Sequence, residues 1–443
     1  MKKILLLLSL CICILTWGGE NPKYIFLFIG DGMSTPQRMT AEEFSRKIGR
    51  GQLMINTLPF HATTRTNSSG SLITDSAAAA TAIACGEKTK NGRIGMDAAG
   101  VRKLESVAKV AKAKGKKVGI VTSVTINHAT PAGFYANRNS RGEYYAIGLD
   151  LIASGFDYFG GGGCAKNDDK KAPGYKGDIY KLAAESGYKI IDSKAGLMAL
   201  RPGSGKVWAR GASGALPYNI DNDRQVATLA EFTAKGIELL DNPNGFFMMI
   251  EGGAIDWCGH ANDAAGNMYE VLALDDAVKV ALDFLQKHPD ETLIIVTGDH
   301  ETGGMTMGFA GAAKQMNMDR LAHQKCSNDV FKSKIDVARK SNPGFNFEDA
   351  QKMLTENYGF KFDNSKDPMT VNAQELQMLK KGFQKNKLHD AARIVMNRKA
   401  GIGWTSGSHT ALPVLTTSKG VKAEIFTGFI ENTEISKRIK SIL

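Results

Sequence analysis

The segment TDSAAAATA, from Thr74 to Ala82, places a serine directly before a run of alanines. Serine, threonine and aspartate are favoured at helix N-caps and alanine is the best helix former, so capping of a helix by Ser76 is a sufficient structural explanation. The chemical alternative is that Ser76 is a nucleophile. A helix N-terminus presents backbone N–H groups and the positive end of the helix dipole, which together attract an anionic substrate. The segment alone favours capping, so support for the nucleophile must come from other residues.

Two further segments carry residues that could bind metal ions. Asp256 and His260 are four positions apart, so on a helix they would share one face and bind the same ion, with Cys258 pointing away. An Asp–His pair on a helix surface explains that spacing equally well. Asp299 and His300 are adjacent at the end of an apolar run, where both could reach one ion. A turn with a hydrogen-bonded histidine is the structural alternative there.

His409 lies in a Gly/Ser-rich loop, where an ordinary exposed histidine is the simpler interpretation. Mixed histidine and carboxylate ligands suit zinc, whereas oxygen ligands alone suit magnesium. These preferences sort the candidates into two zinc sites and one magnesium site: Asp256, His260 and His409; Asp31, Asp299 and His300; and Glu251 with Thr130. Two zinc ions at close range would form a clamp for in-line displacement at phosphorus, which also needs a nucleophile and a group that binds the phosphate.

Four apolar runs must position these residues, because each run ends in polar, chemically capable side chains. They span residues 24–33, 118–130, 246–256 and 292–304. Short, continuous and rich in β-branched residues, they predict strands buried on both faces of a parallel sheet. Segments of helical composition, such as 102–116 and 270–288, lie between them and predict repeated βα units.

The predicted fold is therefore α/β, with a large, mostly parallel central sheet flanked by helices on both faces. In such sheets ligands bind beyond the carboxyl ends of the strands. The polar residues that follow the four runs should therefore gather along one edge: Asp31, His128, Glu251, Asp299 and His300.

The domain organisation is predicted to be a leader followed by one large domain. Residues 1–19 combine two N-terminal lysines, an apolar stretch from Ile4 to Leu15 and small residues at the end, which is the pattern of a signal peptide. The stretch is too short to span a bilayer, and no later run is long enough, so we expect a periplasmic or secreted protein without a membrane span. Residues 20–443 form the domain, with the charged, mostly helical stretch at about 308–399 as an insertion or cap.

Composition restricts the partners. The formal net charge is +11, which could reflect surface lysines or could steer anionic substrates. The sequence contains no arginine-rich tract of the kind that binds nucleic acids, so small anions are the expected partners. Four cysteines remain after the leader, and in an oxidising compartment they permit three pairings, among which the sequence does not choose: Cys85, Cys164, Cys258 and Cys326.

Seven segments, taken together and in this order, resemble the alkaline phosphatase family: FIGDGMS, TDSAAAATA, TKNGRIGMD, HATPAGFYANR, EGGAIDWCGHAND, VTGDHETGG and SGSHTALP. The resemblance extends from Ile25 to Ile430 and is least informative over about 308–399. It implies a phosphoric monoester hydrolase with broad specificity, two zinc ions, one magnesium ion and a phosphoserine intermediate. Homodimers are frequent in that family.

The resemblance also implies roles for single residues. Ser76 matches the nucleophile, which lies at the second zinc ion and has its pKa lowered there, and Asp75 matches a residue that holds the serine and arginine region. The arginine that binds phosphate falls on Arg141 rather than on Arg138. The first zinc ion would stabilise the departing oxygen and then activate water.

Two positions depart from the best-known bacterial pattern. His128 replaces an aspartate near the magnesium site, and Trp257 replaces a lysine after the zinc-ligand Asp256. Both changes bear on magnesium binding and on the hold on phosphate. The enzymatic alternatives are a phosphodiesterase or sulfatase of the same fold, which the matching Arg141 and the alanines after Ser76 disfavour. A metal-stabilised extracellular binding protein without catalysis is the non-enzymatic alternative.

Overall fold

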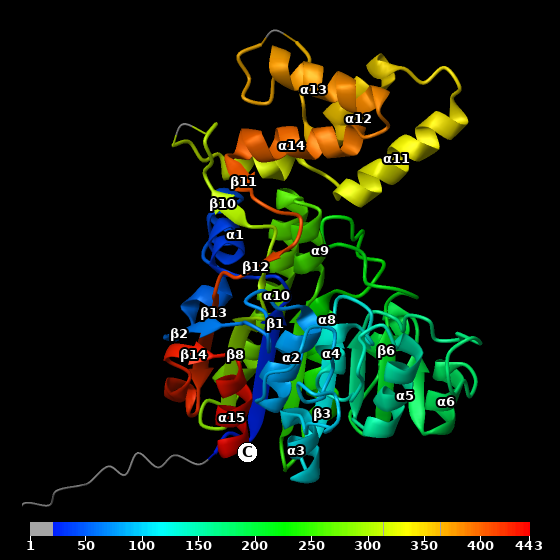
Figure 1. Ribbon diagram of the computed structural model, residues 1–443, viewed down its shortest axis with the longest axis vertical. Coiled ribbons are helices and arrows are strands. Elements are labelled where there is room, and N and C mark those ends of the chain that lie inside the picture. The colour runs from blue at the N-terminus through cyan, green and yellow to red at the C-terminus, as the bar shows by residue number, and fades with distance from the viewer. Residues whose placement is uncertain (1–20, 313, 364) are drawn as a thin grey trace, which may run out of the picture.

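A ten-stranded sheet forms the centre of the computed structural model, which describes residues 21–312, 314–363 and 365–443 (Figure 1). The predicted leader, residues 1–19, lies outside the described residues. In spatial order the strands are β14 (Gly428–Glu431), β2 (Phe60–Arg65), β13 (Val414–Gly420), β8 (Thr292–Gly298), β1 (Tyr24–Gly30), β7 (Phe246–Gly252), β3 (Lys117–Thr122), β4 (Tyr158–Gly161), β6 (Lys206–Arg210) and β5 (Tyr188–Ile191).

The four apolar runs form four adjacent strands at the middle of this sheet, in the order β8, β1, β7 and β3. All their pairings are parallel, as predicted. The sheet is mixed nevertheless, because β13 runs antiparallel to both of its neighbours, β8 and β2. The α/β prediction with a mostly parallel sheet is thus confirmed.

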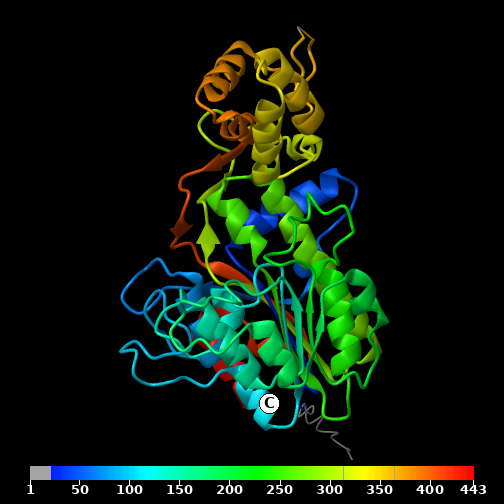
Figure 2. The same cartoon turned by 90° about the vertical axis from the view of Figure 1, so that its right-hand side faces the viewer.

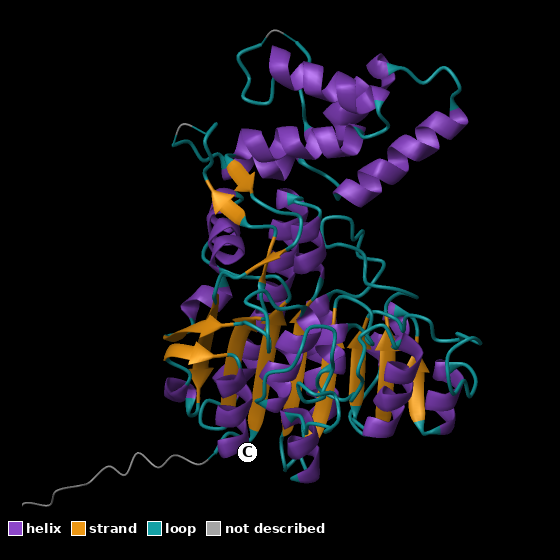
Figure 3. Ribbon diagram, viewed as in Figure 1, coloured by secondary structure: helices purple, strands orange, loops and turns teal. Residues whose placement is uncertain are grey.

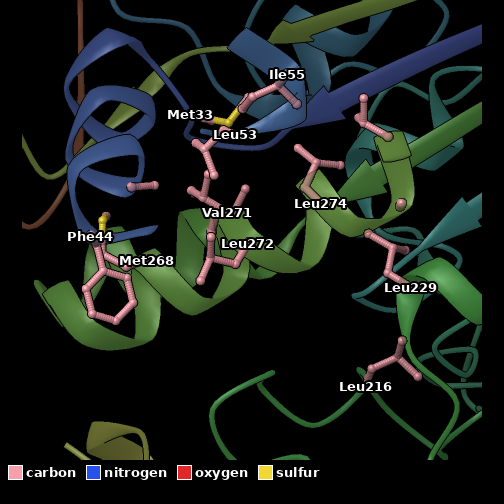
Figure 4. Close-up of a cluster of buried hydrophobic side chains, with 14 of the residues drawn as sticks. Met33, Phe44, Leu53, Ile55, Leu216, Leu229, Met268, Val271, Leu272 and Leu274 are labelled. Atoms are coloured by element: carbon pink, nitrogen blue, oxygen red, sulfur yellow. The ribbon is translucent and has the colours of Figure 1, made fainter. Parts of the chain in front are cut away.

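Burial on both faces explains why these strands have continuous apolar sequences. In β1, Tyr24, Phe26 and Phe28 belong to one hydrophobic cluster, and the alternate residues from Ile25 to Ile29 belong to the cluster on the opposite face. Figure 4 shows part of the first cluster, where Met268, Val271 and Leu272 of the helix α10 (Ala264–Lys287) meet side chains of the N-terminal region. Each fully buried side chain of this kind contributes about 1.5–3 kcal/mol.

Helices cover both faces of the sheet (Figure 3). Among those that contribute to the first cluster are α1 (Thr35–Lys47), α8 (Leu229–Leu240) and α10 (Ala264–Lys287). Those that contribute to the second are α2 (Ser76–Cys85), α3 (Val107–Ala113), α4 (Ala129–Ala132), α5 (Tyr144–Ser154), α6 (Ile179–Glu185) and α15 (Thr433–Ser441). Two short helices complete this part, α7 (Lys194–Ala199) and α9 (Ala254–His260).

The helix predicted at 102–116 is shorter in the structure. It begins after Ser106, whose hydroxyl accepts the N–H of Lys109 at 3.2 Å, and it ends at Ala113. The helix predicted at 270–288 is longer, because Asp263 caps α10 and the helix begins at Ala264. Local capping groups set both boundaries, and the apolar pattern does not reveal them.

A helical layer lies at the end of the molecule away from the sheet, at the top of both Figure 1 and Figure 2. It contains the 3-10 helix η2 (Met318–His323) and the helices α11 (Asn328–Ser341), α12 (Phe347–Tyr358), α13 (Ala373–Gln384) and α14 (Leu388–Ala400). The chain enters through β10 (Met305–Met307) and returns through β11 (Ile402–Trp404), which pair antiparallel.

The four cysteines of the predicted mature chain are free thiols in the structure. Cys258 is buried, away from the face of α9 that carries Asp256 and His260, as predicted. Over the part of the chain that the structure describes, no helix has the length and apolarity needed to cross a bilayer.

Candidate active site

The register of three central strands brings the predicted acidic residues together. Gly30 of β1 pairs with Gly252 of β7 and with Gly298 of β8. Asp31 and Asp299 each follow by one residue, so they emerge side by side from the carboxyl edge of the sheet. The sequence predicts this edge correctly because parallel strands end at the same level.

Asp31, Asp299 and His300 form the first cluster, and all three side chains are completely buried. His300 Nε2 lies 3.3 Å from Asp31 Oδ1 and 3.4 Å from Asp299 Oδ2. Among the described residues, neither of these oxygens has a hydrogen-bond donor. Burial raises the pKa of both carboxyl groups well above their ordinary values and lowers the pKa of His300 well below its own. A bound cation would compensate for this lost hydration, so the residues fit a metal ion.

Asp256, His260 and His409 form the second cluster. Asp256 and His260 share one face of α9, as their spacing predicts, with His260 Nε2 3.4 Å from Asp256 Oδ2. His409 Nε2 lies 3.5 Å from the other carboxylate oxygen. The close approach of Gly32 completes this packing: its φ is +74°, and a Cβ there would lie 2.8 Å from the Cα of Asp256.

Backbone carbonyl groups fix the tautomers of both histidines in this cluster. His260 Nδ1 lies 2.8 Å from Gly407 O, and His409 Nδ1 lies 2.8 Å from Thr74 O. A carbonyl oxygen only accepts, so both Nδ1 atoms carry the proton and both Nε2 atoms of the neutral rings present lone pairs. These Nε2 atoms are 3.2 Å apart and would repel each other unless a proton or a metal ion lies between them. The arrangement fits a zinc ion.

Thr302 joins the two clusters, and it was not among the residues predicted from the sequence. Its hydroxyl donates to Asp256 Oδ1, and its Oγ1 lies 3.2 Å from His300 Nδ1. Because the single hydroxyl proton goes to the carboxylate, Oγ1 accepts from His300 Nδ1–H and leaves Nε2 of His300 with its lone pair toward the first cluster. The rings of His300 and His409 stack with centroids 3.7 Å apart, so the two clusters are adjacent. The one available signal was the position of Thr302 two residues after His300.

Ser76 does not cap α2, contrary to the structural interpretation of the segment. Asp75 is the N-cap, and its Oδ1 accepts the N–H of Ala78 at 2.9 Å. Ser76 is the first helical residue, and its Oγ lies 3.3 Å from His300 Nε2. Because aspartate performs the capping, the serine hydroxyl is available to the first cluster.

Arg141 and Arg138 have different partners. Arg141 Nη1 donates to Asp75 Oδ2 at 3.1 Å, so the guanidinium group lies beside the start of α2. Arg138 instead forms a bidentate ion pair with Asp150, through Nε at 2.8 Å and Nη2 at 2.6 Å. The structure therefore brings Arg141, and not Arg138, to the residues around Ser76.

A third cluster contains Asp31, His128 and Glu251. Asp31 thus belongs to two clusters, and its Oδ2 accepts from Thr130 Oγ1 at 3.3 Å. Burial raises the pKa of Glu251 to about 7. One Glu251 oxygen accepts from Thr122, which the sequence did not suggest, and among the described residues the other oxygen has no donor. These oxygen atoms fit a hard cation such as magnesium.

His128 and Trp257 are neighbours, although they are far apart in the sequence. Their rings meet edge to face with centroids 6.1 Å apart. His128 Nε2 lies 3.2 Å from Arg141 Nη2, so it accepts from the guanidinium. Burial and the charge of Arg141 lower the pKa of His128 to about 3, and the ring is neutral. All the candidate residues therefore lie in one connected region at the carboxyl edge of the sheet.

Residues 22–443 match the profile of the family described as alkaline phosphatase. Alkaline phosphatase 3 of Bacillus subtilis is 31% identical, over 95% of this chain and 88% of its own length. The cold-active alkaline phosphatase of a Shewanella species has a similar structure, with a TM-score of 0.82 and 30% identity over 95% of this chain and 99% of that one.

The alkaline phosphatase of the Antarctic bacterium TAB5 is also similar, with a TM-score of 0.70 and 26% identity over 96% of this chain and 98% of that one. A variant of the TAB5 protein with one histidine replaced by glutamate was solved with magnesium bound in its M3 site.

Proposed function

Because this chain belongs to the alkaline phosphatase family and is a phosphomonoesterase, we propose that it hydrolyses phosphate monoesters through a phosphoserine intermediate on Ser76, with two zinc ions and one magnesium ion bound. One observation carries the proposal. Ser76 Oγ lies 3.3 Å from the same His300 nitrogen that faces the donor-free oxygens of Asp31 and Asp299. A metal ion held there would be within reach of the serine oxygen.

The groups around Ser76 are suited to binding and orienting a phosphate. At the start of α2 the N–H groups and the dipole favour an anion. Arg141 can donate two parallel N–H bonds to non-bridging oxygens, and Asp75 holds that guanidinium through Nη1. Asp75 also accepts from Gly92 N at 2.9 Å, so one carboxylate fixes the helix start, a loop and the arginine together.

The reaction then proceeds in two displacements. Ser76 Oγ attacks phosphorus and the alcohol leaves; water next attacks the phosphoserine and releases inorganic phosphate, which regenerates the serine. Asp31, Asp299 and His300 would hold one zinc ion, and Asp256, His260 and His409 the other. When bound, zinc supplies Lewis acidity that lowers the pKa of a nearby hydroxyl and offsets negative charge on the reacting oxygens.

Glu251 and Thr130, with His128 beside them, would hold magnesium. The magnesium-bound TAB5 variant, in which a carboxylate replaces a histidine, supports a divalent-cation site in this fold. Here the neutral His128 ring occupies the position next to Arg141. We propose that it contributes to the position of Arg141 together with Trp257.

Broad specificity for the alcohol is part of the proposal, because phosphoryl transfer depends chiefly on positioning and charge at the phosphoryl group itself. We also propose export through residues 1–19 to the periplasm or the medium, and association as a homodimer. Light scattering of the purified mature protein would measure the latter.

Hydrolysis of p-nitrophenyl phosphate by the protein loaded with zinc and magnesium tests the function. We expect turnover that is lost in Ser76→Ala and on addition of a chelator, while Ser333→Ala on the exposed face of α11 retains it. Acid quenching should trap phosphate on Ser76, detectable by mass spectrometry. Absence of turnover with both metals present, or full turnover in Ser76→Ala, would refute the proposal.

A further inference from the structure

A cavity of about 480 Å³ lies between α14 and β11, and neither the catalytic groups nor the metal clusters use it. We name it the Trp404 pocket. Its walls include Phe309, Arg393, Asn397, Arg398, Trp404 and Thr405. Figure 1 shows β11 directly beneath α14, with α9 below.

The Trp404 pocket adjoins the cluster of Asp256, His260 and His409. Its residue Asn262 follows His260 by two positions and donates to Ser406 O at 2.9 Å. His260 Nδ1 contacts the next residue of that loop, Gly407, through its carbonyl. The loop 405–408 therefore has the metal cluster on one side and the pocket on the other.

Trp404 packs close to α9, the helix that carries Asp256 and His260. A Cβ on Gly303 would approach the indole ring to 2.5 Å and the carbonyl oxygen of Gly259 to 2.9 Å, so the indole and α9 converge on this glycine. His260 is the most exposed of the cluster's ligands, with a side chain 40% accessible. A substrate whose phosphate sits at the metal clusters and whose remainder extends past His260 would meet the Trp404 pocket next.

The lining of the pocket selects a chemical class. It contains two arginines and no acidic residue. Arg398 is exposed, and within the described part of the chain no carboxylate lies within 4 Å of it. Arg393 pairs with Asp390 at 3.1 Å, and among the described residues its buried Nε and the buried Nε1 of Trp404 have no hydrogen-bond partner. Asn397 is already used, since its side chain donates to Asn262 O at 2.8 Å.

Phe309 and Trp404 add aromatic walls to this positive pocket. A planar ring can stack on such side chains, and an arginine fork binds phosphate oxygens with two N–H groups. Resting on the proposed function, we propose that the Trp404 pocket binds the alcohol portion of substrates that carry both a ring and a second anionic group, as in nucleoside bisphosphates. Such esters would be preferred within an otherwise broad substrate range.

Three substrates separate the ring from the charge: adenosine 3′,5′-bisphosphate has both, adenosine 5′-monophosphate has only the ring outside its scissile phosphate, and glycerol 2-phosphate has neither. We expect Arg398→Gln to lower kcat/KM for first phosphate release from the bisphosphate about tenfold, and to leave the other two unchanged. Phe309→Leu should lower kcat/KM for both nucleotides about threefold and leave kcat/KM for glycerol 2-phosphate unchanged.

Arg201→Gln is the matched control, because it removes the same charge from an arginine that contacts the carbonyl groups of Met198 and Leu200. Glycerol 2-phosphate reports folding and catalysis in each variant. Equal losses on all three substrates in Arg398→Gln, or an unchanged bisphosphate rate, would overturn the pocket assignment while leaving the phosphatase intact. No hydrolysis of any substrate by the unmodified protein would instead refute the proposed function.

Discussion

Replacement of Arg141 by alanine should weaken inhibition by inorganic phosphate by roughly a hundredfold. Two charge-assisted hydrogen bonds are lost, each worth about 1.5 kcal/mol at the low end, because the side chain is 30% exposed. The sum of about 3 kcal/mol corresponds to a factor of roughly 100 in the inhibition constant. The inhibition constant of Arg141→Lys should lie between those of the unmodified protein and of Arg141→Ala, since an ammonium group retains the charge without the planar fork.

The variant should remain folded. Without Arg141, Asp75 Oδ2 still accepts from Gly92 N and Oδ1 still caps α2 through Ala78 N. The carboxylate is therefore not left without partners, and the position of Ser76 is retained. Loss of phosphate binding can then be attributed to the arginine itself.

Arg138→Ala is the matched control. It breaks the bidentate ion pair between Arg138 and Asp150, whose side chains are 28% and 23% exposed, respectively. The loss should cost at most about 1 kcal/mol of stability and should leave the inhibition constant for phosphate unchanged. The assay is competitive inhibition of p-nitrophenyl phosphate hydrolysis by phosphate, with the free energy of unfolding measured in parallel. Equal effects of Arg138→Ala and Arg141→Ala on the inhibition constant would refute the assignment of the phosphate-binding role.

Two more substitutions test the interior of the site and of the fold. Thr302→Val removes the acceptor for His300 Nδ1–H and a donor to Asp256, so zinc content after dialysis should fall at least tenfold by elemental analysis; full retention of zinc would contradict the orienting role of this hydroxyl. Burial raises the pKa of Glu270 from 4.5 to about 7 in the folded state, so between those pH values the folded protein holds a proton that the unfolded chain has lost, and stability falls as pH rises. Glu270→Gln abolishes this titration. As the pH rises from 4.5 to 8, the unfolding free energy of the parent should therefore fall by about 3 kcal/mol relative to that of the variant. A pH-independent difference in urea unfolding would show that Glu270 does not titrate in this window.

The sequence predicted the fold well because its strongest signals are local. Short apolar runs rich in β-branched residues favour strands buried on both faces, and β1, β3, β7 and β8 are such strands at the middle of the sheet. The spacing of Asp256 and His260 likewise fixed their shared helical face, since helix periodicity is an intrinsic property of the backbone.

Several features depended on the tertiary structure. The structural interpretation of the sequence placed the cap of α2 on Ser76, whereas the structure assigns it to Asp75. The antiparallel direction of β13 and the membership of Asp31 in two clusters follow from strand order and register, which are set by contacts between distant segments.

Residue types and spacing selected the candidate metal-binding histidines, but not what orients them. Their tautomers are set by the carbonyl groups of Gly407 and Thr74 and by the hydroxyl of Thr302. A carbonyl belongs to every residue and so leaves no mark in a sequence. Which carbonyl lies beside which ring is decided only when the C-terminal loop folds back over α9 and the start of α2. The same folding sets the directions in which the Nε2 lone pairs of these histidines point.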